Sequence, residues 1–339
     1  MSDRLKKVLQ FILFFSLGVF LLWWLYKDWD FERIKKALRE TDYLWIWISF
    51  IFAILSHFSR SLRWRMLIKS LGYKPKVMNT LFAVMGNYLI NLLIPRMGEI
   101  SRCALIKRYE GISFSKLIGT VFIERVVDLL ILFLLTIVVA ITNLDVIKQF
   151  INNNPEVRDK VNNLLTNTNF WLIVIFIIVL FTVLIFLYRK RLKGTKLYIK
   201  GRSVFKNIVE GIKTIFRLKH AWLFILHSLF IWAMYFLMLY ICFFAFDYTD
   251  HLTPMVGLTL FVMGSYGMVA PVSGGMGAWH FMISRTLIVY GLTVVEGESF
   301  AFVHYAAMNS MVVVVGIICL IVMPIYNRKR TARGINSKS

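Results

Sequence analysis

The chain has 339 residues, of which 58% are hydrophobic and only 17% are charged, and this excludes a soluble globular domain. Its 40 Lys and Arg against 18 Asp and Glu give a formal net charge of +22. The cations stand in loops between apolar runs, an arrangement that argues against a nucleic-acid partner. We expect an all-α integral membrane protein of the cell (inner or plasma) membrane, a single polytopic domain over residues 1–339.

The N-terminal segment predicts a first span and a surface helix. An apolar run at residues 8–25 follows Arg4, Lys6 and Lys7, as in a signal peptide. Aromatic residues follow it in place of a small-residue cleavage site, so it predicts an uncleaved span with the N-terminus in the cytoplasm. Residues 27–42 balance five basic against five acidic side chains, which predicts an amphipathic helix on the outer face of the membrane.

The next segment predicts a second span and a first hairpin, called hairpin 1. The span, residues 43–57, runs into residues 60–76, which include Arg60 and Arg63, contain no acid and predict a cytoplasmic loop. The following apolar run, residues 80–94, would be only about 22 Å long as a helix. More cations follow it. Because both ends then lie in the cytoplasm, the run predicts a re-entrant hairpin that turns at residues 95–98.

Two more spans complete a first half of about residues 1–188. They are expected at residues 117–141 and 170–188, with a net-neutral outer loop at 143–169. Residues 189–219 carry eleven Lys and Arg against one Glu, and they predict a cytoplasmic linker between the halves. Two interpretations of this linker stay open: a solvated loop that sets the orientation, or a patch for anionic lipid headgroups.

The second half, about residues 220–326, has different flanking charges. A span at residues 221–246 ends at acidic residues. The run 253–270 then breaks at Pro271 and returns through residues 279–290 to further acids, with no Lys or Arg on either flank. It predicts a second hairpin, hairpin 2, that enters from outside. A last span at 300–325 precedes a basic tail, 327–339, which places the C-terminus in the cytoplasm.

Short matching segments stand at corresponding places in the two halves. MGNY at residues 85–88 precedes Met97-Gly98, and MGSY at residues 263–266 precedes Met276-Gly277. Gly- and Pro-interrupted apolar segments in two halves point to a transport site near the bilayer midplane. The sequence thus predicts six transmembrane helices plus two re-entrant helical hairpins arranged as an inverted repeat. The expected hairpin tips are Pro95, Gly98, Pro271, Ser273, Gly274, Gly275 and Gly277.

Ionisable residues concentrate at hairpin 1 and the third span. Such side chains are costly inside a membrane, and guanidinium groups suit phosphate, so they are candidates for binding a lipid phosphate. The expected phosphate ligands are Arg96, Arg102, Arg125, Asn91 and Arg285, and the carboxylates expected to orient them are Glu99, Glu124 and Asp128. For Glu124, Arg125 and Asp128 a second interpretation stays open, an ion pair that clamps the third span to hairpin 1 through Arg96 or Arg102.

The sequence offers little for covalent chemistry. No nucleophile–base pair stands out, and Cys103, Cys242 and Cys319 are far apart without metal-ligand spacing. We therefore expect no catalytic residue, no metal and no cofactor. An enzyme embedded in the membrane stays open as an alternative.

Three motifs carry a resemblance to a known family: NLLIPRMGEISR at residues 91–102, FIERVVD at 122–128 and PVSGGMG at 271–277. They resemble the transmembrane region of lysylphosphatidylglycerol synthase, also called the flippase-like domain family, over nearly the whole chain. The resemblance implies a lipid-handling membrane domain. In full-length synthases a cytosolic aminoacyl-transferase domain follows it; none is expected here, because about thirteen residues follow the last span. The family often has a Glu where this chain has His280.

These observations lead to three hypotheses about function. The first is a lipid translocase that moves an anionic phospholipid or a polyprenyl-phosphate-linked lipid between leaflets. The second is an accessory subunit that binds a lipid and presents it to a partner glycosyl- or aminoacyl-transferase. The third is an intramembrane lipid transferase. The expected partners are a membrane lipid and a lipid-modifying transferase, and no nucleic acid.

Overall fold

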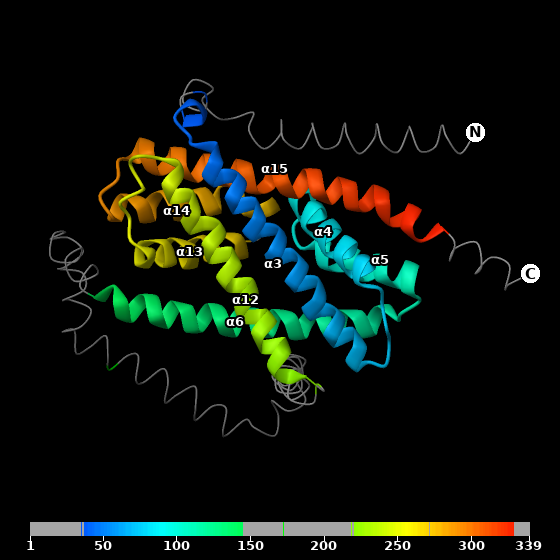
Figure 1. Ribbon diagram of the computed structural model, residues 1–339. Helices are drawn as coiled ribbons and strands as arrows, with labels where there is room; N and C mark the ends of the chain where they lie inside the picture. Colours follow the sequence, from blue (N-terminus) through cyan, green and yellow to red (C-terminus); the bar gives the residue numbers. More distant parts are fainter. Residues whose placement is uncertain are drawn as a thin grey trace, which may run out of the picture. The chain divides into compact units, whose positions relative to one another are not determined.

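The computed structural model describes residues 37–144, 220–270 and 272–328, with the single residues 35, 172 and 218 (Figure 1). The chain divides into two compact units, Met1–Thr136 with Arg217–Ser339, and Ile137–Phe216. The helices below belong to the first unit, apart from the last residues of α6. Every regular element in the described ranges is a helix.

Four helices in the described part of the chain are long and apolar enough to cross a membrane, which indicates a multi-pass membrane protein. They are α3 (Tyr43–Ser70), α6 (Phe114–Thr142), α12 (Ala221–Tyr240), which η1 (Ile241–Ala245) extends, and α15 (Val294–Tyr326). They confirm the helices predicted for the second, third, fifth and sixth spans. The predicted spans at 8–25 and 170–188, most of the surface helix, nearly all of the linker and most of the basic tail lie outside the described residues.

Two helical hairpins lie between these long helices. Hairpin 1 consists of α4 (Val77–Leu93) and α5 (Met97–Glu110), and hairpin 2 of α13 (Pro254–Val269), η2 (Ser273–Gly275) and α14 (Ala278–Val289). Each half of the described chain therefore has one order: a long helix, a hairpin of shorter helices and a long helix. α3 and α12, which precede hairpin 1 and hairpin 2 in the chain, lie side by side (Figure 1). α15 packs against both α4 and α14.

The turn of hairpin 1 follows from Pro95. The residue before a proline avoids the helical region, and Ile94 is extended at φ −132°, ψ 117°. Arg96 then takes the left-handed region at φ 62°, where it is the only non-glycine with positive φ in the described chain. Asn91 caps the new helix, because its side-chain oxygen accepts a 2.7 Å hydrogen bond from the backbone N–H of Gly98.

The turn of hairpin 2 is made by glycines, as the sequence predicts. Gly274, Gly275 and Gly277 have φ of 59°, 76° and 76°, which favour residues without Cβ. Pro271 and the side chain of Ser273 lie outside the described residues. The tip also touches the other hairpin: a Cβ on Gly274 would lie 2.7 Å from Leu92 Cδ2 at the end of α4. The two hairpin tips are therefore in contact.

The matching segments of the two halves serve close packing. A Cβ on Gly98 would lie 2.1 Å from the backbone oxygen of Asn87, and one on Gly267 would lie 2.7 Å from Trp279 Cα, so the arms of each hairpin meet at a glycine. A Cβ on Gly86 or Gly264, the glycines of MGNY and MGSY, would lie 2.9 Å from a side chain of α15 or α14 respectively. Small residues at such positions let helices approach closely where apolar surface meets lipid.

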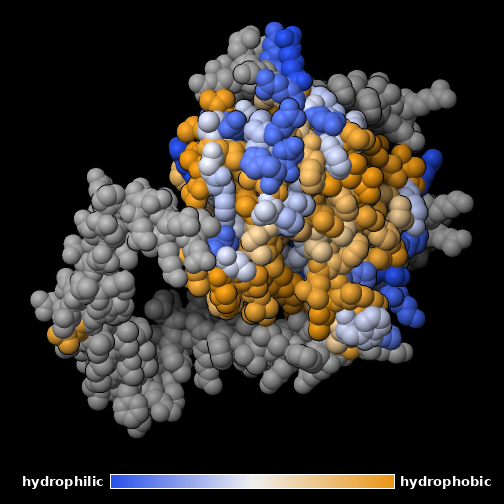
Figure 2. Space-filling model, turned by 60° about the vertical axis from the view of Figure 1, so that its left-hand side comes forward, coloured by the Kyte–Doolittle hydropathy of each residue, from blue (hydrophilic) through white to orange (hydrophobic). Residues whose placement is uncertain are grey.

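The outer surface is largely apolar. Trp47, Phe133 and Trp222 are 61–66% exposed, and Figure 2 shows a broad apolar area on the side that it presents. α6 in particular makes few close backbone approaches to the other helices. Long polar side chains connect it to them, and these form the site described next.

Candidate functional site

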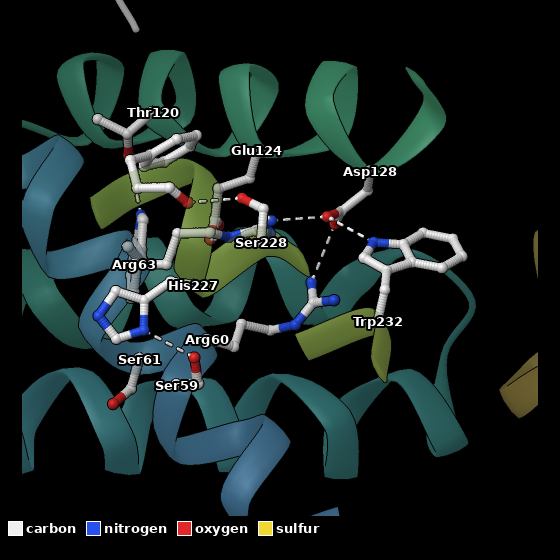
Figure 3. Close-up of polar contacts among 12 residues, drawn as sticks. Ser59, Arg60, Ser61, Arg63, Thr120, Glu124, Asp128, His227, Ser228 and Trp232 are labelled. Atoms are coloured by element: carbon white, nitrogen blue, oxygen red, sulfur yellow. Dashed lines mark hydrogen bonds and ion pairs between the residues drawn. The ribbon is translucent and has the colours of Figure 1, made fainter. Parts of the chain in front are cut away.

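Five charged side chains from three helices form a buried cluster, here called the ion network. Arg60 and Arg63 come from α3, Arg102 from α5, and Glu124 and Asp128 from α6. Figure 3 shows Glu124 and Asp128 pointing from α6 toward the two arginines of α3. All five are buried, and Arg63 and Glu124 are fully so.

Asp128 joins both arginines of α3. Its Oδ1 lies 2.8 Å from Arg63 Nη1, and its Oδ2 lies 3.2 Å from Arg60 Nη1. Trp232 Nε1 of α12 reaches Oδ1 at 3.5 Å, a long hydrogen bond. Arg60 and Arg63 are three residues apart and so share a helix face, which lets one carboxylate bind both.

Glu124 joins α5 to α3. Its Oε2 lies 2.8 Å from Arg102 Nη1, and its Oε1 lies 3.5 Å from Arg63 Nε. Because Glu124 and Asp128 are four residues apart on α6, they present two carboxylates on one face. This geometry matches the clamp interpretation, in which ion pairs hold the third span to hairpin 1 and Arg102 is the partner.

Aromatic and hydroxyl groups fix the arginines in place. The Arg102 guanidinium stands 4.7 Å from the centre of the Trp64 ring, and Trp64 in turn donates a 2.9 Å hydrogen bond to Thr120 Oγ1 of α6. Arg63 Nη1 donates to Ser228 Oγ of α12 at 3.1 Å. The ion network therefore connects α3, α5, α6 and α12.

The ion network carries more positive than negative charge. Three guanidinium groups face two carboxylates. Several buried polar atoms of the network have no hydrogen-bond partner among the described residues: Arg60 Nε, Arg63 Nε and Nη2, Arg102 Nε and Nη2, and both carboxylate oxygens of Glu124, which contact the arginines as ion pairs only. A buried donor without a partner costs about 1–3 kcal/mol. Stability alone therefore does not explain this arrangement, since apolar residues of similar volume would serve a core as well.

A second ion pair lies between hairpin 1 and α6. Arg125 Nη2 contacts Glu99 Oε1, and the two side chains are 43% and 22% exposed, so this pair is far more accessible than the ion network. Arg125 follows Glu124 by one residue, about 100° around the helix, and therefore faces away from Arg63. Arg125 thus pairs with Glu99 of hairpin 1.

The other predicted ligands are dispersed. Asn91 caps α5, and Arg96 is exposed at the turn of hairpin 1 with no ion pair to any described residue. Arg285 is exposed on α14, where its guanidinium lies 5.6 Å from the ring centre of Phe281, and it does not join the ion network. The structure thus gathers Arg102, Glu124 and Asp128 of the predicted residues.

Arg60 and Arg63 are the residues that sequence reasoning missed. The predicted end of the second span near residue 57 is wrong, because α3 continues to Ser70 and both side chains are buried within it. The spacing of residues could have indicated their burial. Positions on one helix face are three and four residues apart, as are Ser56, Arg60, Arg63 and Leu67.

Comparisons with known proteins agree with the fold. The family model described as the lysylphosphatidylglycerol synthase TM region matches residues 8–316. A UPF0104 membrane protein of Methanocaldococcus jannaschii is 32% identical over 111 residues, and the aligned segment spans about a third of each protein, 32% of this chain and 33% of the relative. No solved structure matches the chain. The match over most of its length shows that the chain belongs to the family of the lysylphosphatidylglycerol synthase transmembrane region.

Proposed function

We propose that the protein is a flippase-like lipid translocase, which moves an anionic phospholipid or a polyprenyl-phosphate-linked lipid between leaflets. In this proposal the two hairpins are re-entrant from opposite sides of the membrane, and the lipid headgroup passes when their tips separate. The observation that carries it is the contact between Gly274 of hairpin 2 and Leu92 of hairpin 1. Such paired interruptions occur where transporters bind substrate at the midplane.

The backbone at both tips supports a position within the membrane. Lipid cannot satisfy backbone polar groups, so irregular backbone at that depth needs partners within the protein. Gly98 donates its N–H to Asn91, and the Gly274 carbonyl accepts a 3.0 Å hydrogen bond from the Tyr305 hydroxyl. Side chains of the protein thus replace water at each tip.

The flanking charges support opposite orientations. Hairpin 1 is followed by cations such as Lys107 and Arg108, whereas acidic residues, Asp250 and Glu298 among them, flank hairpin 2. Basic segments favour the cytoplasmic side. This asymmetry is expected if hairpin 1 enters from the cytoplasm and hairpin 2 from outside.

The half-exposed pair of Arg125 and Glu99 is suited to receive a headgroup. Its guanidinium is accessible between α5 and α6, and a phosphate can replace Glu99 on it with two parallel hydrogen bonds. Arg96 lies exposed at the adjoining turn in a left-handed conformation, which costs a non-glycine residue about 1–2 kcal/mol. A strained, exposed cation at a turn is a reasonable second contact for an anionic lipid.

Lipid translocation in proteoliposomes tests this proposal. Arg125→Gln and Arg96→Ala are each expected to slow transfer of a labelled anionic lipid about tenfold or more, because each removes a charge-assisted contact to phosphate. Arg108→Gln, which removes an exposed cation from the same hairpin, serves as the matched control and should leave the rate unchanged. Rates equal to the wild type in both Arg125→Gln and Arg96→Ala would contradict the proposed role of these residues.

The same contact between the tips is compatible with a second function. The tips are closed against each other, as expected of a protein that holds a lipid for a partner transferase without moving it across. Purified protein with bound lipid and a co-purifying transferase, but without translocation above that of empty liposomes, would support this alternative.

A further inference from the structure

Arg102 has a vacant, buried edge. A guanidinium group can bind an oxyanion side-on through Nε and Nη2, which donate two parallel hydrogen bonds. Arg102 contacts Glu124 through Nη1 only, at 2.8 Å, and both Nε and Nη2 are buried without a hydrogen-bond partner among the described residues. Its side chain is 1% exposed, so bulk water does not satisfy these donors.

Arg63 presents a similar edge. Its Nη2 has no hydrogen-bond partner in the described part of the chain, and its Nε lies 3.5 Å from Glu124 Oε1 without forming a hydrogen bond. Glu124 thus stands between Arg63 and Arg102 and pairs with both. The unpartnered donors of the two arginines therefore belong to residues that share Glu124 as an ion-pair partner.

The net charge of the ion network favours a bound anion, as do the donors without partners. Arg60, Arg63 and Arg102 exceed Glu124 and Asp128 by one positive charge, and all five are buried. A bound water could accept hydrogen bonds from these nitrogens, but it would leave the charge uncompensated. One anion with several acceptor oxygens would satisfy both demands.

We infer that Arg102 and Arg63 form a buried binding site for a single phosphate group. The inference rests on the proposed function and deepens it, because it adds an interior site beyond the accessible Arg125–Glu99 pair. Phosphate fits for three reasons: it is tetrahedral, it matches the guanidinium edge, and it carries the missing charge. Trp64, whose ring centre lies 4.7 Å from the Arg102 guanidinium, packs against this side chain and restricts its movement.

Occupation of this site would compete with Glu124. A phosphate on the Nε–Nη2 edge of Arg102 would lie near Glu124, and repulsion between the two anions would weaken the 2.8 Å pair of Arg102 with Glu124, which joins α5 of hairpin 1 to α6. This pair is one of several contacts of α6, beside the pairs of Asp128 with the arginines of α3 and the apolar packing of Leu117 and Val121. Phosphate binding and loosening of hairpin 1 from α6 are thereby linked.

Calorimetric titration of the purified protein in detergent tests the site without a bilayer. The probes are inorganic phosphate and, separately, a short-chain phosphatidylglycerol. Arg102→Lys keeps the charge but removes the paired donors, and it should weaken binding about tenfold to a hundredfold. Glu124→Gln removes the competing carboxylate and should strengthen binding about tenfold, provided that one nearby charge contributes as much as a typical ion pair. Arg108→Lys, exposed on the same helix, should match the wild type.

Arg102→Lys should weaken phosphate binding and Glu124→Gln should strengthen it. A purely structural role of these residues would not change the affinity in opposite directions. If Arg102→Lys fails to fold, as judged by its elution profile and thermal unfolding, Glu124→Gln decides the question. Equal phosphate affinity in the wild type and in the folded variants, or no binding of either probe to the wild type, would overturn the site.

The two probes identify the source of the phosphate. Displacement of inorganic phosphate by the short-chain lipid assigns the site to a lipid headgroup, and binding of inorganic phosphate alone assigns it to the free ion. Because no leaflets are present, this result is independent of translocation. Phosphate binding without lipid translocation would support this site and contradict the proposed function. Lipid translocation without phosphate binding would support the proposed function and contradict this site.

Discussion

Replacing Arg63 with alanine is expected to lower the free energy of unfolding by about 3–5 kcal/mol, the usual effect of removing one partner from a buried ion pair. Asp128 would lose its closest cation, at 2.8 Å, and Glu124 would lose one of its two partners. Ser228 would lose its contact with the guanidinium as well. The carboxylates would remain buried with too few donors, which is costlier than the loss of the contacts themselves.

The loss of stability is measured by unfolding the purified variant in detergent with heat or denaturant. Lys69→Ala is the matched control, because it removes an exposed cation from the last turn of the same helix and should change stability by less than about 0.5 kcal/mol. In the double variant Arg63→Ala/Asp128→Ala the loss should be smaller than the sum of the two single losses. A change within 0.5 kcal/mol for Arg63→Ala would show that the ion network does not hold α3 to α6.

Substitution of Gly98 by alanine is expected to cost about 3 kcal/mol, the upper part of the range for overpacking. The added Cβ would lie 2.1 Å from the Asn87 backbone oxygen and 2.7 Å from the side chain of Asn91. Neither the backbone nor the capping side chain can move without disturbing the turn. Hairpin 1 would open near its tip and release Asn91 from the N–H of residue 98.

Gly119→Ala on α6 provides the comparison for Gly98→Ala. A Cβ at position 119 meets no atom within 4 Å, so the exchange of glycine for alanine in a helix should be neutral or stabilising by up to about 1 kcal/mol. Thermal unfolding of both variants in the same detergent gives the difference. If Gly98→Ala were as stable as Gly119→Ala, the close approach of the arms in hairpin 1 would be refuted.

The helices and hairpins could be predicted because local signals mark them. Pro95 excludes a helical conformation at Ile94, and glycines at 274, 275 and 277 supply the positive φ that hairpin 2 needs. α6, α12 and α15 contain apolar runs that are long enough to cross a bilayer, although α15 begins six residues before the predicted span. These features depend on neighbours in the sequence and are visible there.

The partners within the ion network could not be predicted in the same way. Arg63 binds Asp128, 65 residues further along the chain, and nothing local to either residue indicates this pairing. The apolar run before Arg60 suggested that a span had ended, whereas the helix continued and buried its cations. Glu124 and Asp128 were visible as charges inside a span. Their need for cations pointed to partners elsewhere, and these proved to include Arg60 and Arg63.

The most direct test of the account is a reversible crosslink between the hairpin tips. A Cβ on Gly274 would lie 3.9 Å from Leu92 Cα, so cysteines at both positions can approach the Cβ separation of about 3.5–4.5 Å that a disulfide needs. The native cysteines, all buried, are left in place in a control with neither substitution. After oxidation of Leu92→Cys/Gly274→Cys in proteoliposomes, with thiol labelling to confirm the crosslink, lipid translocation should fall to the rate of protein-free liposomes and recover on reduction. Translocation at the wild-type rate by the fully crosslinked protein would contradict passage of lipid between the two tips.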